Sequence, residues 1–436
     1  MSIVDVLKEV ILDFQARALE TGVPRHLRIV PVPGKAAVCL GVRRGGKSTY
    51  LFQVMETLYG RGVKPQNVLY VNLFDDRLHE LAHQGAAPIL EAYFSLFPEK
   101  KGTETVYCFF DEIQIVKDWE PFVDRLLRTE RCEVYLSGSS ARLLSREVAT
   151  QMRGRALSWE LFPFSFAEFL DFKGVQHRPE TSRNRLLAQK GFEDYWRKGG
   201  FPETRNVPDA VRVMIHQEYF RTMVYRDIVE RHDAMHPQAV LDLAFRLVNN
   251  VAANHSVNSL TGYLKALNHK VSKAFVGECL EWLGDAYFLF QVKLWDASLA
   301  RQNVNAKKVY CIDHALVGSV SSGILVNSGH LLENLVFLHL RRKTERIHYF
   351  RTQSGREVDF ICQDPRGQRH LVQVCESFAG NPETQRREVA ALTEAMQEMQ
   401  IEEGTIVTRD EAQELETPAG RINVFPAWRF LLEEVV

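Results

Sequence analysis

Nine residues near the N-terminus, Gly41–Thr49, constrain the fold of this chain more than any other stretch. They form the pattern Gly-x4-Gly-Lys-Ser, follow the apolar run Ala36–Leu40 and precede Tyr50–Tyr59, whose apolar residues have helical spacing. A glycine-rich turn between a buried strand and a helix lets backbone N–H groups point at phosphate oxygens. The pattern therefore predicts an α/β fold with a nucleoside triphosphate site. An ordinary glycine-rich surface turn is the alternative.

Two side chains of this loop are expected to act on the nucleotide. Lys47 would reach the β- and γ-phosphates, and the Ser48 hydroxyl would hold a magnesium ion. Mg²⁺ is therefore a predicted cofactor beside the nucleotide. The predicted nucleotide-binding residues are Gly41, Arg44, Gly45, Gly46, Lys47, Ser48 and Thr49.

A second signature lies downstream, where the apolar run Val106–Phe110 ends in Asp111 and Glu112. An aspartate at the carboxyl end of a strand can orient magnesium, so Asp111 joins Ser48 as a predicted metal ligand. The adjacent Glu112 can polarise the attacking water and is the predicted catalytic base. A strand that ends in Asp-Glu only for reasons of turn geometry is the alternative. The upstream phosphate loop favours hydrolysis.

Strands and helices alternate around these motifs. Further strands are expected at Asn67–Phe74 and Glu133–Leu136, with helices between them. This alternation predicts a parallel sheet with helices on both faces. The run Ser137–Ser140 then supplies hydroxyls at the end of a strand, and Ser139 is the predicted sensor of the γ-phosphate or the water. An ordinary Ser-Gly turn is the alternative.

Composition narrows the class of protein. With 45% apolar and 25% charged residues, the 436-residue chain is typical of a globular protein of roughly three domains. No apolar run approaches the ~18 residues of a membrane span, and the N-terminus lacks the layout of a signal peptide. Seven scattered cysteines without a Cys-x-x-Cys pair indicate the reducing cytoplasm. The net charge of −1 gives no global sign of nucleic-acid binding.

Several motifs of the chain occur together in one known family. They are Asp111–Gln114, Trp119-Glu120, Ser137–Leu144, Met152–Arg155, Leu161–Phe166, Gly199–Glu203 and Tyr225–Ile228. In this order they resemble the large group of prokaryotic AAA+-type P-loop ATPases with a C-terminal domain similar to restriction endonucleases. The resemblance implies an ATPase core (residues 1–165), a helical lid (166–237), a winged helix-turn-helix (238–318) and an α/β nuclease-like domain (319–436).

The resemblance also implies ATP as the nucleotide and assembly into a ring, with a hexamer favoured. In such rings an arginine of one subunit completes its neighbour's active site, where it neutralises charge on the transferred phosphate. Arg153 and Arg155 are the candidates, since they follow the strand before Ser137 by a helix's length. An arginine pair that only solvates a loop is the alternative.

The expected winged helix-turn-helix is doubtful as a reader of DNA. Its expected recognition helix, predicted to begin after Ser272, carries Lys273 but also Glu278 and Glu281, which the phosphate backbone would repel. Contacts with the phosphates are left to five lysines of the region: Lys265, Lys270, Lys293, Lys307 and Lys308. A winged helix used for packing against protein is the alternative.

The last hundred or so residues resemble the PD-(D/E)xK nuclease core. Active members hold a divalent metal with carboxylates and activate water with a lysine. Glu333 and Asp359 are in place, but the (D/E)-x-Lys position holds Gln373 and Cys375. A neutral amide is a weak metal ligand and cysteine supplies no cation, so we expect no nuclease activity. A basic approach remains for DNA or a partner: Arg341, Arg342, Lys343, Arg346, Arg351 and Arg356.

The leading hypothesis is a Mg²⁺-dependent ATP hydrolase that forms a ring and works on duplex or branched DNA. The alternative is a nucleotide-dependent switch or scaffold that binds a protein partner, for example in defence or toxin–antitoxin systems. Such a switch would hydrolyse ATP slowly and would not respond to DNA. The acidic stretch 373–420 slightly favours this alternative.

Overall fold

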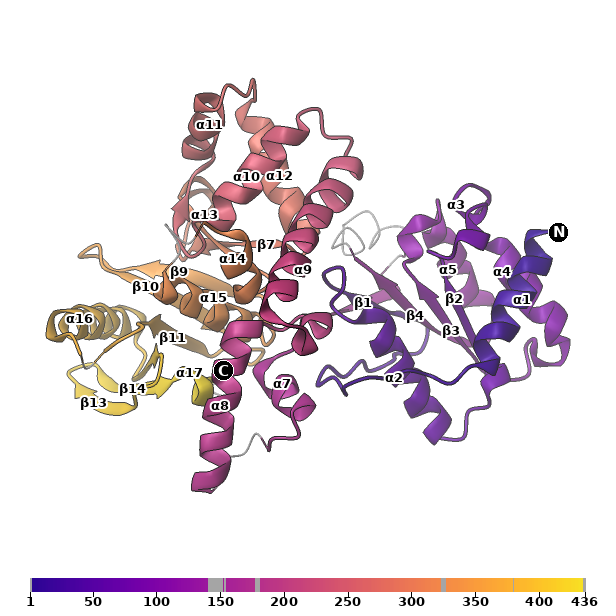
Figure 1. Ribbon diagram of the computed structural model, residues 1–436, viewed down its shortest axis with the longest axis horizontal. Helices are drawn as coiled ribbons and strands as arrows, with labels where there is room; N and C mark the ends of the chain where they lie inside the picture. The colour runs from indigo at the N-terminus through magenta and orange to yellow at the C-terminus, as the bar shows by residue number, and fades with distance from the viewer. Residues whose placement is uncertain are drawn as a thin grey trace. The chain divides into compact units, whose positions relative to one another are not determined.

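The chain divides into two units, Met1–Phe162 and Pro163–Val436, and each contains one β-sheet (Figure 1). The division into four domains expected from the sequence stays a prediction. In this computed structural model the described residues are 2–139, 152, 154–176, 181–322, 327–378 and 380–433.

The first unit contains a five-stranded sheet in the order β2-β3-β4-β1-β5, and every neighbouring pair is parallel. The predicted parallel α/β sheet is thereby confirmed. All five residues of the strand before the phosphate loop are buried, which explains its continuous apolar run. The strands are β1 (Ala36–Leu40), β2 (Val68–Asn72), β3 (Val106–Asp111), β4 (Cys132–Gly138) and β5 (Ala156–Glu160).

The order of the strands places the two motifs close together, because β4 alone lies between β1 and β3. The phosphate loop leaves the end of β1, and Asp111 ends β3. Since the strands are parallel, their carboxyl ends share one edge of the sheet. Ser137, near the end of β4 and in register with Cys39 of β1, therefore lies between the two motifs.

Helices and short turns connect these strands. The first helix shows why the sequence folds in this way: the Ser2 side chain caps it by accepting a hydrogen bond from the Asp5 amide at 3.2 Å. Its apolar face includes Phe14, which stacks on Tyr70 of β2 at 4.2 Å. The helices are α1 (Ile3–Ala16), α2 (Lys47–Gly60), α3 (Leu81–Gln84), α4 (Ala87–Leu96) and α5 (Trp119–Thr129), with 3₁₀ turns at Pro65–Asn67, Asp76–Leu78, Pro98–Lys100 and Ile113–Ile115.

The second unit begins with helices, in agreement with the helical character expected of residues 166–237. Ser165 and Glu168 form a reciprocal capping box at the start of α7. The chain then continues through a π-helical segment directly after α9. These elements are α7 (Phe166–Phe172), α8 (Ser182–Lys198), a 3₁₀ segment (Pro202–Asn206), α9 (Asp209–Thr222) and the π-helical segment (Met223–Glu230).

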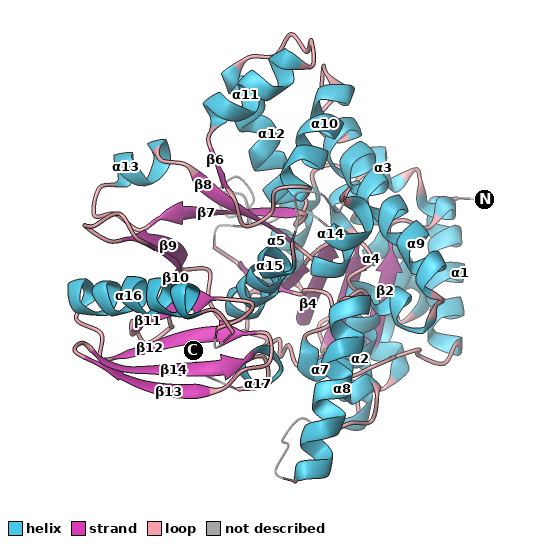
Figure 2. Cartoon of the chain, turned by 60° about the vertical axis from the view of Figure 1, so that its left-hand side comes forward, coloured by secondary structure: helices cyan, strands magenta, loops and turns pink. Residues whose placement is uncertain are grey.

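The rest of the second unit contains a nine-stranded mixed sheet, in the order β13-β14-β12-β11-β10-β9-β7-β8-β6 (Figure 2). Its strands are β6 (Asn254–His255), β7 (Leu289–Leu294), β8 (Lys307–Cys311), β9 (Ile347–Arg351), β10 (Glu357–Gln363), β11 (Arg369–Val374), β12 (Glu403–Thr408), β13 (Gln413–Thr417) and β14 (Gly420–Pro426). The antiparallel pair β7–β8 joins the remaining strands because β7 pairs in parallel with β9. One sheet thus runs across the boundary predicted near residue 318.

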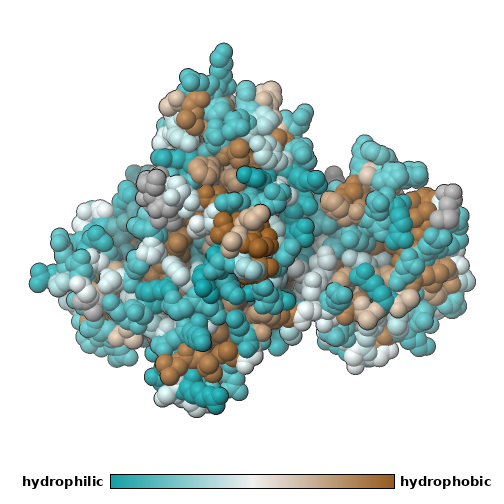
Figure 3. All heavy atoms as spheres, in the orientation of Figure 1, coloured by the Kyte–Doolittle hydropathy of each residue, from teal (hydrophilic) through white to brown (hydrophobic). Residues whose placement is uncertain are grey.

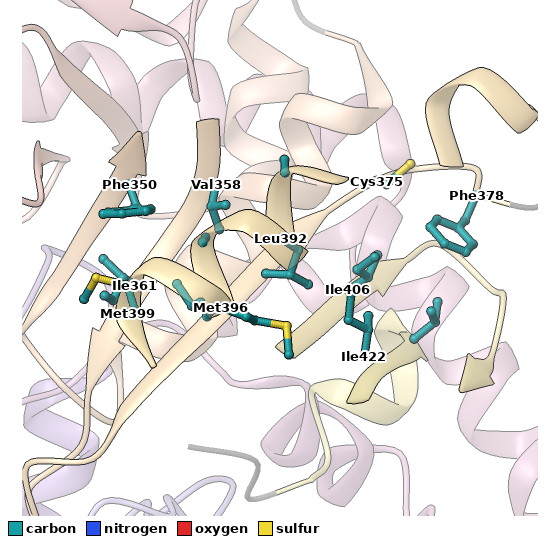
Figure 4. Close-up of a cluster of buried hydrophobic side chains, with 14 residues drawn as sticks. Phe350, Val358, Ile361, Cys375, Phe378, Leu392, Met396, Met399, Ile406 and Ile422 are labelled. Atoms are coloured by element: carbon teal, nitrogen blue, oxygen red, sulfur yellow. The ribbon is translucent and has the colours of Figure 1, made fainter. Parts of the chain in front are cut away.

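Further helices of the second unit pack on this sheet or on one another. They are α10 (Pro237–Val248), α11 (Val257–Ala266), α12 (Lys273–Asp285), α13 (Leu299–Val304), α14 (His314–Val320), α15 (Ser328–Arg341), α16 (Pro382–Met399) and α17 (Ala427–Phe430). Ser272 caps α12, as the sequence predicts, by accepting a hydrogen bond from the Phe275 amide at 3.1 Å. Buried side chains of α16, among them Leu392 and Met396, fill the core against the sheet (Figure 4).

The face shown in Figure 3 is mostly hydrophilic, and its hydrophobic residues form separate patches. Exposed large apolar side chains include Leu186 on α8, Met214 on α9 and Val304 on α13. Single exposed residues of this kind are normal and do not by themselves mark an interface between subunits. The assembly into a ring expected from the sequence therefore stays a prediction. Among the described residues, no helix has both the length and the apolar character that crossing a membrane requires.

Candidate functional site

The phosphate loop joins the end of β1 to the start of α2. Gly46 is the N-cap of α2 and has a left-handed backbone with φ 96°, which favours glycine. Gly41 has no room for a side chain, since a Cβ there would lie 2.1 Å from the Leu161 carbonyl oxygen. The seven predicted nucleotide-binding residues thus form one loop and the first turn of a helix, where free backbone N–H groups favour anions.

Lys47 connects this loop to the second signature. Its side chain is buried, and its Nζ donates hydrogen bonds to the carbonyl oxygens of Gly41 and Val42, each at 3.1 Å. The same Nζ lies 3.8 Å from Oε1 of Glu112, which directly follows β3. The structure therefore brings the two motifs into one site.

Asp111 is held from both sides by hydroxyl groups. Tyr70 donates a hydrogen bond to Oδ2 at 3.0 Å, and Ser137 donates one to Oδ1. The Asp111 carboxylate is 1% exposed and forms no ion pair with any residue that the structure describes. Burial of an uncompensated negative charge is costly, so this carboxylate fits a bound Mg²⁺ ion. Ser48, on the first turn of α2, is the second residue that could hold it.

The charge of Glu112 is set by its neighbours. Burial alone would raise the pKa of this carboxyl, but Lys47, Gln114, Arg43 and Ser139 together lower it below its ordinary value. The Gln114 amide also donates a hydrogen bond to Oε2 and orients the group. An ionised, oriented carboxylate can accept a proton from water. Ser139, the predicted sensor, is buried at this edge of the sheet.

Three residues that support this site were not singled out in the sequence. Tyr70 lies inside an apolar strand, where an aromatic residue is ordinary, and Ser137 was one of several serines in its run. Arg25 donates from a guanidinium nitrogen to the Gly45 carbonyl oxygen at 3.0 Å. Its backbone amide donates to the Gln53 side chain of α2 at 3.0 Å. No spacing rule identifies a loop residue such as Arg25 in advance.

The two candidate arginines differ in what the structure says about them. Arg153 lies outside the described residues. Arg155 is half-buried, and its guanidinium lies 3.5 Å from Oδ1 of Asp124 on α5. Arg128 pairs with the same aspartate at 3.0 Å. An ion pair within the chain is the arrangement expected of an arginine that stabilises its own loop, and the role in a neighbouring subunit stays a prediction.

A second acidic centre lies in the other unit. Glu333 of α15 and Asp359 of β10 come together, as the resemblance to nucleases implies, and Glu357 joins them. At their centre is the ammonium group of Lys308 from β8. The expectation that Lys308 contacts DNA phosphates is wrong, because this side chain is buried.

Gln373 and Cys375 occupy different surroundings. The Gln373 side chain accepts a hydrogen bond from the Asp359 amide at 3.1 Å and donates one to Glu388 at 2.7 Å. Cys375 belongs to the apolar core beneath α16 (Figure 4). Burial raises the pKa of its thiol to about 11, so it stays neutral. Neither residue supplies the cation of an active nuclease.

The predicted basic approach is largely engaged within the chain. Arg341 pairs with Glu345, Arg351 with Glu357 and Arg356 with Glu394. Arg342 and Lys343 donate to the carbonyl oxygens of Pro163 and Glu433, and Arg346 donates to the Gln363 side chain. The three ion pairs reduce the positive charge that is free for a nucleic acid, and the hydrogen bonds to neutral oxygens occupy N–H donors of the other three side chains.

Comparisons with protein families agree with the first unit. The AAA domain family matches residues 33–170, which include the phosphate loop, Asp111 and Glu112. Two families described as domains of unknown function match parts of the second unit, DUF8612 at residues 189–324 and DUF4143 at residues 328–430.

Solved structures show only a distant likeness. The Orc1 protein of Aeropyrum pernix in complex with DNA is 16% identical, with 74% of this chain and 92% of that chain covered and a TM-score of 0.30. AMPPCP-bound DnaA of Aquifex aeolicus is 13% identical, with 64% and 86% covered and a TM-score of 0.22. At these TM-scores the likenesses support no conclusion about this chain.

Relatives known from sequence are much more similar. An uncharacterized protein of Haemophilus influenzae is 27% identical, with 75% of this chain and 79% of the relative covered. The uncharacterized protein MJ1544 of Methanocaldococcus jannaschii is 33% identical, with 98% of this chain and 95% of the relative covered. Because this identity extends over nearly the whole of both proteins, the chain belongs to the family of MJ1544, with an AAA domain at residues 33–170.

Proposed function

We propose that this protein is a Mg²⁺-dependent ATP hydrolase. The observation that carries the proposal is the meeting of the two signatures, with Lys47 Nζ 3.8 Å from Glu112 Oε1. A lysine for phosphate, a buried carboxylate for magnesium and an ionised carboxylate for water are the groups that phosphoryl transfer to water requires. The match of residues 33–170 to the AAA domain family supports the same reaction.

Each group has a proposed role. The loop amides and the N-terminus of α2 would bind the phosphates, and Lys47 would pair with the β- and γ-phosphates. Ser48 and Asp111 would hold Mg²⁺, which when bound neutralises charge on the phosphate oxygens. Glu112 would accept a proton from the attacking water. Ser139 would sense the γ-phosphate or that water.

The proposal includes a homo-oligomeric ring, with a hexamer favoured and Arg153 or Arg155 acting on the neighbouring subunit. Its support is the resemblance to AAA+-type ATPases. A substitution of either arginine that lowers the rate of ATP hydrolysis and spares ATP affinity would support a role in trans. Unchanged turnover in both variants would remove this part of the proposal.

The leading proposal for the role of ATP hydrolysis is that it drives the second unit to bind and move DNA. Its support is the order of elements from α10 to β8, which fits a winged helix, together with exposed Lys265, Lys270 and Lys273. Such contacts would engage phosphates without strong sequence preference.

The rival function, a nucleotide-dependent switch that binds a protein partner, is favoured by one observation. Three arginines of the basic approach, Arg341, Arg351 and Arg356, form ion pairs with Glu345, Glu357 and Glu394 of the same chain. A surface whose cations are already paired attracts a polyanion less strongly.

One experiment tests the proposal and separates the two functions. The ATPase rate of the pure protein is measured with and without single-stranded, duplex and four-way-junction DNA, with the Glu112→Gln variant as the blank. Stimulation of several-fold by one DNA form would establish the DNA-directed function. A low rate that no DNA changes would favour the switch, and a rate equal to the blank would refute ATP hydrolysis.

A further inference from the structure

The acidic centre of the second unit holds a cation supplied by the chain itself. Lys308 Nζ lies 2.9 Å from Oε1 of Glu333, 3.0 Å from Oε1 of Glu357 and 2.8 Å from Oδ1 of Asp359. Lys308 is 3% exposed. A buried lysine surrounded by three carboxylates is uncommon, because charged side chains are rarely buried without full compensation.

The geometry matches an ammonium group. A lysine has three N–H donors and no acceptor, and here three carboxylate oxygens lie within hydrogen-bond distance of its nitrogen. The separations are those of charge-assisted hydrogen bonds. They exceed the ~2.0–2.6 Å at which Mg²⁺ and Ca²⁺ bind oxygen, so the carboxylates are spaced around the nitrogen and not around a metal ion.

Other protein groups also donate hydrogen bonds to the carboxylates of the centre. Tyr310 donates one at 2.7 Å to Glu333 Oε1, the oxygen that Lys308 also contacts, and the Val374 amide donates one to Asp359 Oδ2 at 3.0 Å. The second oxygen of Glu357 accepts hydrogen bonds from Asn254 and Arg351, each at 3.2 Å. In the described part of the chain, no group of three or more His, Cys, Asp or Glu side chains is arranged to hold a metal ion.

The neutral side chain of Gln373 also agrees with a centre that holds one positive charge. Its oxygen accepts a hydrogen bond from the Asp359 amide, and its nitrogen donates one to Glu388. The backbone donor and the carboxylate acceptor fix the orientation of this amide. A glutamate at this position could not donate to Glu388 and would add a fourth carboxylate to the centre. The neutral residue is therefore suited to a singly charged cation.

We propose that Lys308 takes the place of the divalent metal that the nuclease-like arrangement would otherwise hold. Its ammonium group is the permanent cation of the Glu333–Glu357–Asp359 centre and fastens the β7–β8 pair to α15 and β10. The residues present do not fit a divalent ion while Lys308 is in place. This inference concerns the second unit alone and does not depend on ATP hydrolysis by the first.

The first test asks whether removal of the lysine creates a metal site. Binding of Mn²⁺ without nucleotide is measured by its paramagnetic resonance signal for the unmodified protein, Lys308→Met and the double variant Lys308→Met with Asp359→Asn. We expect Lys308→Met to bind one more Mn²⁺ per chain than the unmodified protein, and the double variant to lose it. Equal binding by the unmodified protein and Lys308→Met would overturn the proposal.

A second measurement uses the unmodified protein, so it stands even if Lys308→Met does not fold. Lysine amines of the full chain are acetylated in a short pulse, and modification of Lys308 is compared by mass spectrometry with that of its neighbour Lys307. We expect Lys308 to react at least about tenfold more slowly, because its amine is enclosed and its nearby carboxylates favour the charged form. We expect millimolar Mg²⁺ to leave this protection unchanged. Equal rates at both lysines, or faster labelling of Lys308 with Mg²⁺, would mean that the ammonium is not a permanent occupant.

Discussion

The two acidic centres of this molecule contain the same kinds of residue but compensate their charge in different ways. In the first unit, Asp111 accepts hydrogen bonds from the hydroxyls of Tyr70 and Ser137 and pairs with no cation among the described residues. In the second unit, Glu333 and Asp359 surround the ammonium of Lys308. Hydroxyl donors orient a carboxylate and leave its charge in place, whereas an ammonium group cancels charge.

The difference shows that a pair of carboxylates does not define a metal site by itself. A buried carboxylate needs a compensating charge, and the neighbours decide whether a bound ion or the chain supplies it. On this argument the first centre depends on a bound cation and the second does not. Single substitutions and changes of pH can test that contrast, and we expect the greatest change in turnover at the first centre.

Glu112→Gln should have the largest effect on turnover. The substitution keeps the size of the side chain but removes the group that would accept a proton from water, so we expect the ATPase rate to fall at least about a hundredfold. ATP affinity should stay within about threefold, because Lys47 and the loop still bind the phosphates. Both quantities can be measured by steady-state kinetics and nucleotide titration.

Glu99→Gln is the matched control, since Glu99 is an exposed carboxylate of the same unit. It should leave both the rate and the affinity unchanged. If Glu112→Gln hydrolyses ATP as fast as this control, the first centre is not a hydrolytic site. The difference in charge compensation between the two centres would then not reflect a difference in function.

Lys308→Met should have the largest effect on stability. It removes the buried ammonium that pairs with two buried carboxylates, Glu333 and Asp359, and with the partly exposed Glu357. Breaking a buried charge arrangement of this kind costs about 3–5 kcal/mol in the free energy of unfolding. Lys307→Met, one residue away on the same strand and only half-buried, should cost about 0.5 kcal/mol or less. Denaturant unfolding of the second unit measures both. Equal losses of unfolding free energy in the two variants would show that the Lys308 ammonium does not compensate the charge of the surrounding carboxylates.

The contrast between Lys307 and Lys308 also shows where prediction from sequence stops. Alternation along a strand requires neighbouring residues to face opposite sides, so one of the two lysines should face the interior. Which one it is depends on Glu333 and Asp359, which lie on other elements far along the chain. From the sequence alone, both lysines are therefore expected on a DNA-facing surface, and this is wrong for Lys308.

The phosphate loop and its flanking elements could be predicted because their residues are neighbours in the sequence. The strand Ala36–Leu40, the phosphate loop and the start of α2 adjoin one another in the chain, so one stretch of sequence contains the whole arrangement. The parallel sheet followed from the alternation of strands and helices. Tyr70 and Arg25 act on this site from separate segments through contacts that only the folded chain creates, and no local pattern marks them.

Changing the pH tests the second centre without touching its lysine. Burial and the Asp359 charge raise the pKa of Glu333 from 4.5 to about 7. The folded state therefore retains a proton that the unfolded state has lost between these values, and the stability that this residue contributes falls as the pH rises through about 7.

We expect the second unit to lose about 1–2 kcal/mol more stability between pH 5.5 and pH 7.5 in the unmodified protein than in Glu333→Gln. The glutamine variant has no proton to lose at this position, so it isolates the contribution of Glu333. Identical pH profiles for the two proteins would contradict the raised pKa of Glu333 and the close packing of this buried carboxyl group against Asp359.

Tyr70→Phe tests the smaller claim that hydroxyl donors position the carboxylate of the first centre. The change removes one hydrogen bond of 3.0 Å to Asp111 and keeps the ring that stacks on Phe14. A hydrogen bond of this kind is worth about 0.5–1.5 kcal/mol, so turnover should fall about two- to tenfold with ATP affinity unchanged. Tyr107→Phe on the adjacent strand is the control and should have no effect.

In a protein that already carries Asp111→Asn, the loss of turnover caused by Tyr70→Phe should disappear, because two residues that act through one contact do not contribute additively. If the loss persists there, Tyr70 acts through packing, and hydroxyl positioning no longer distinguishes the first centre from the second.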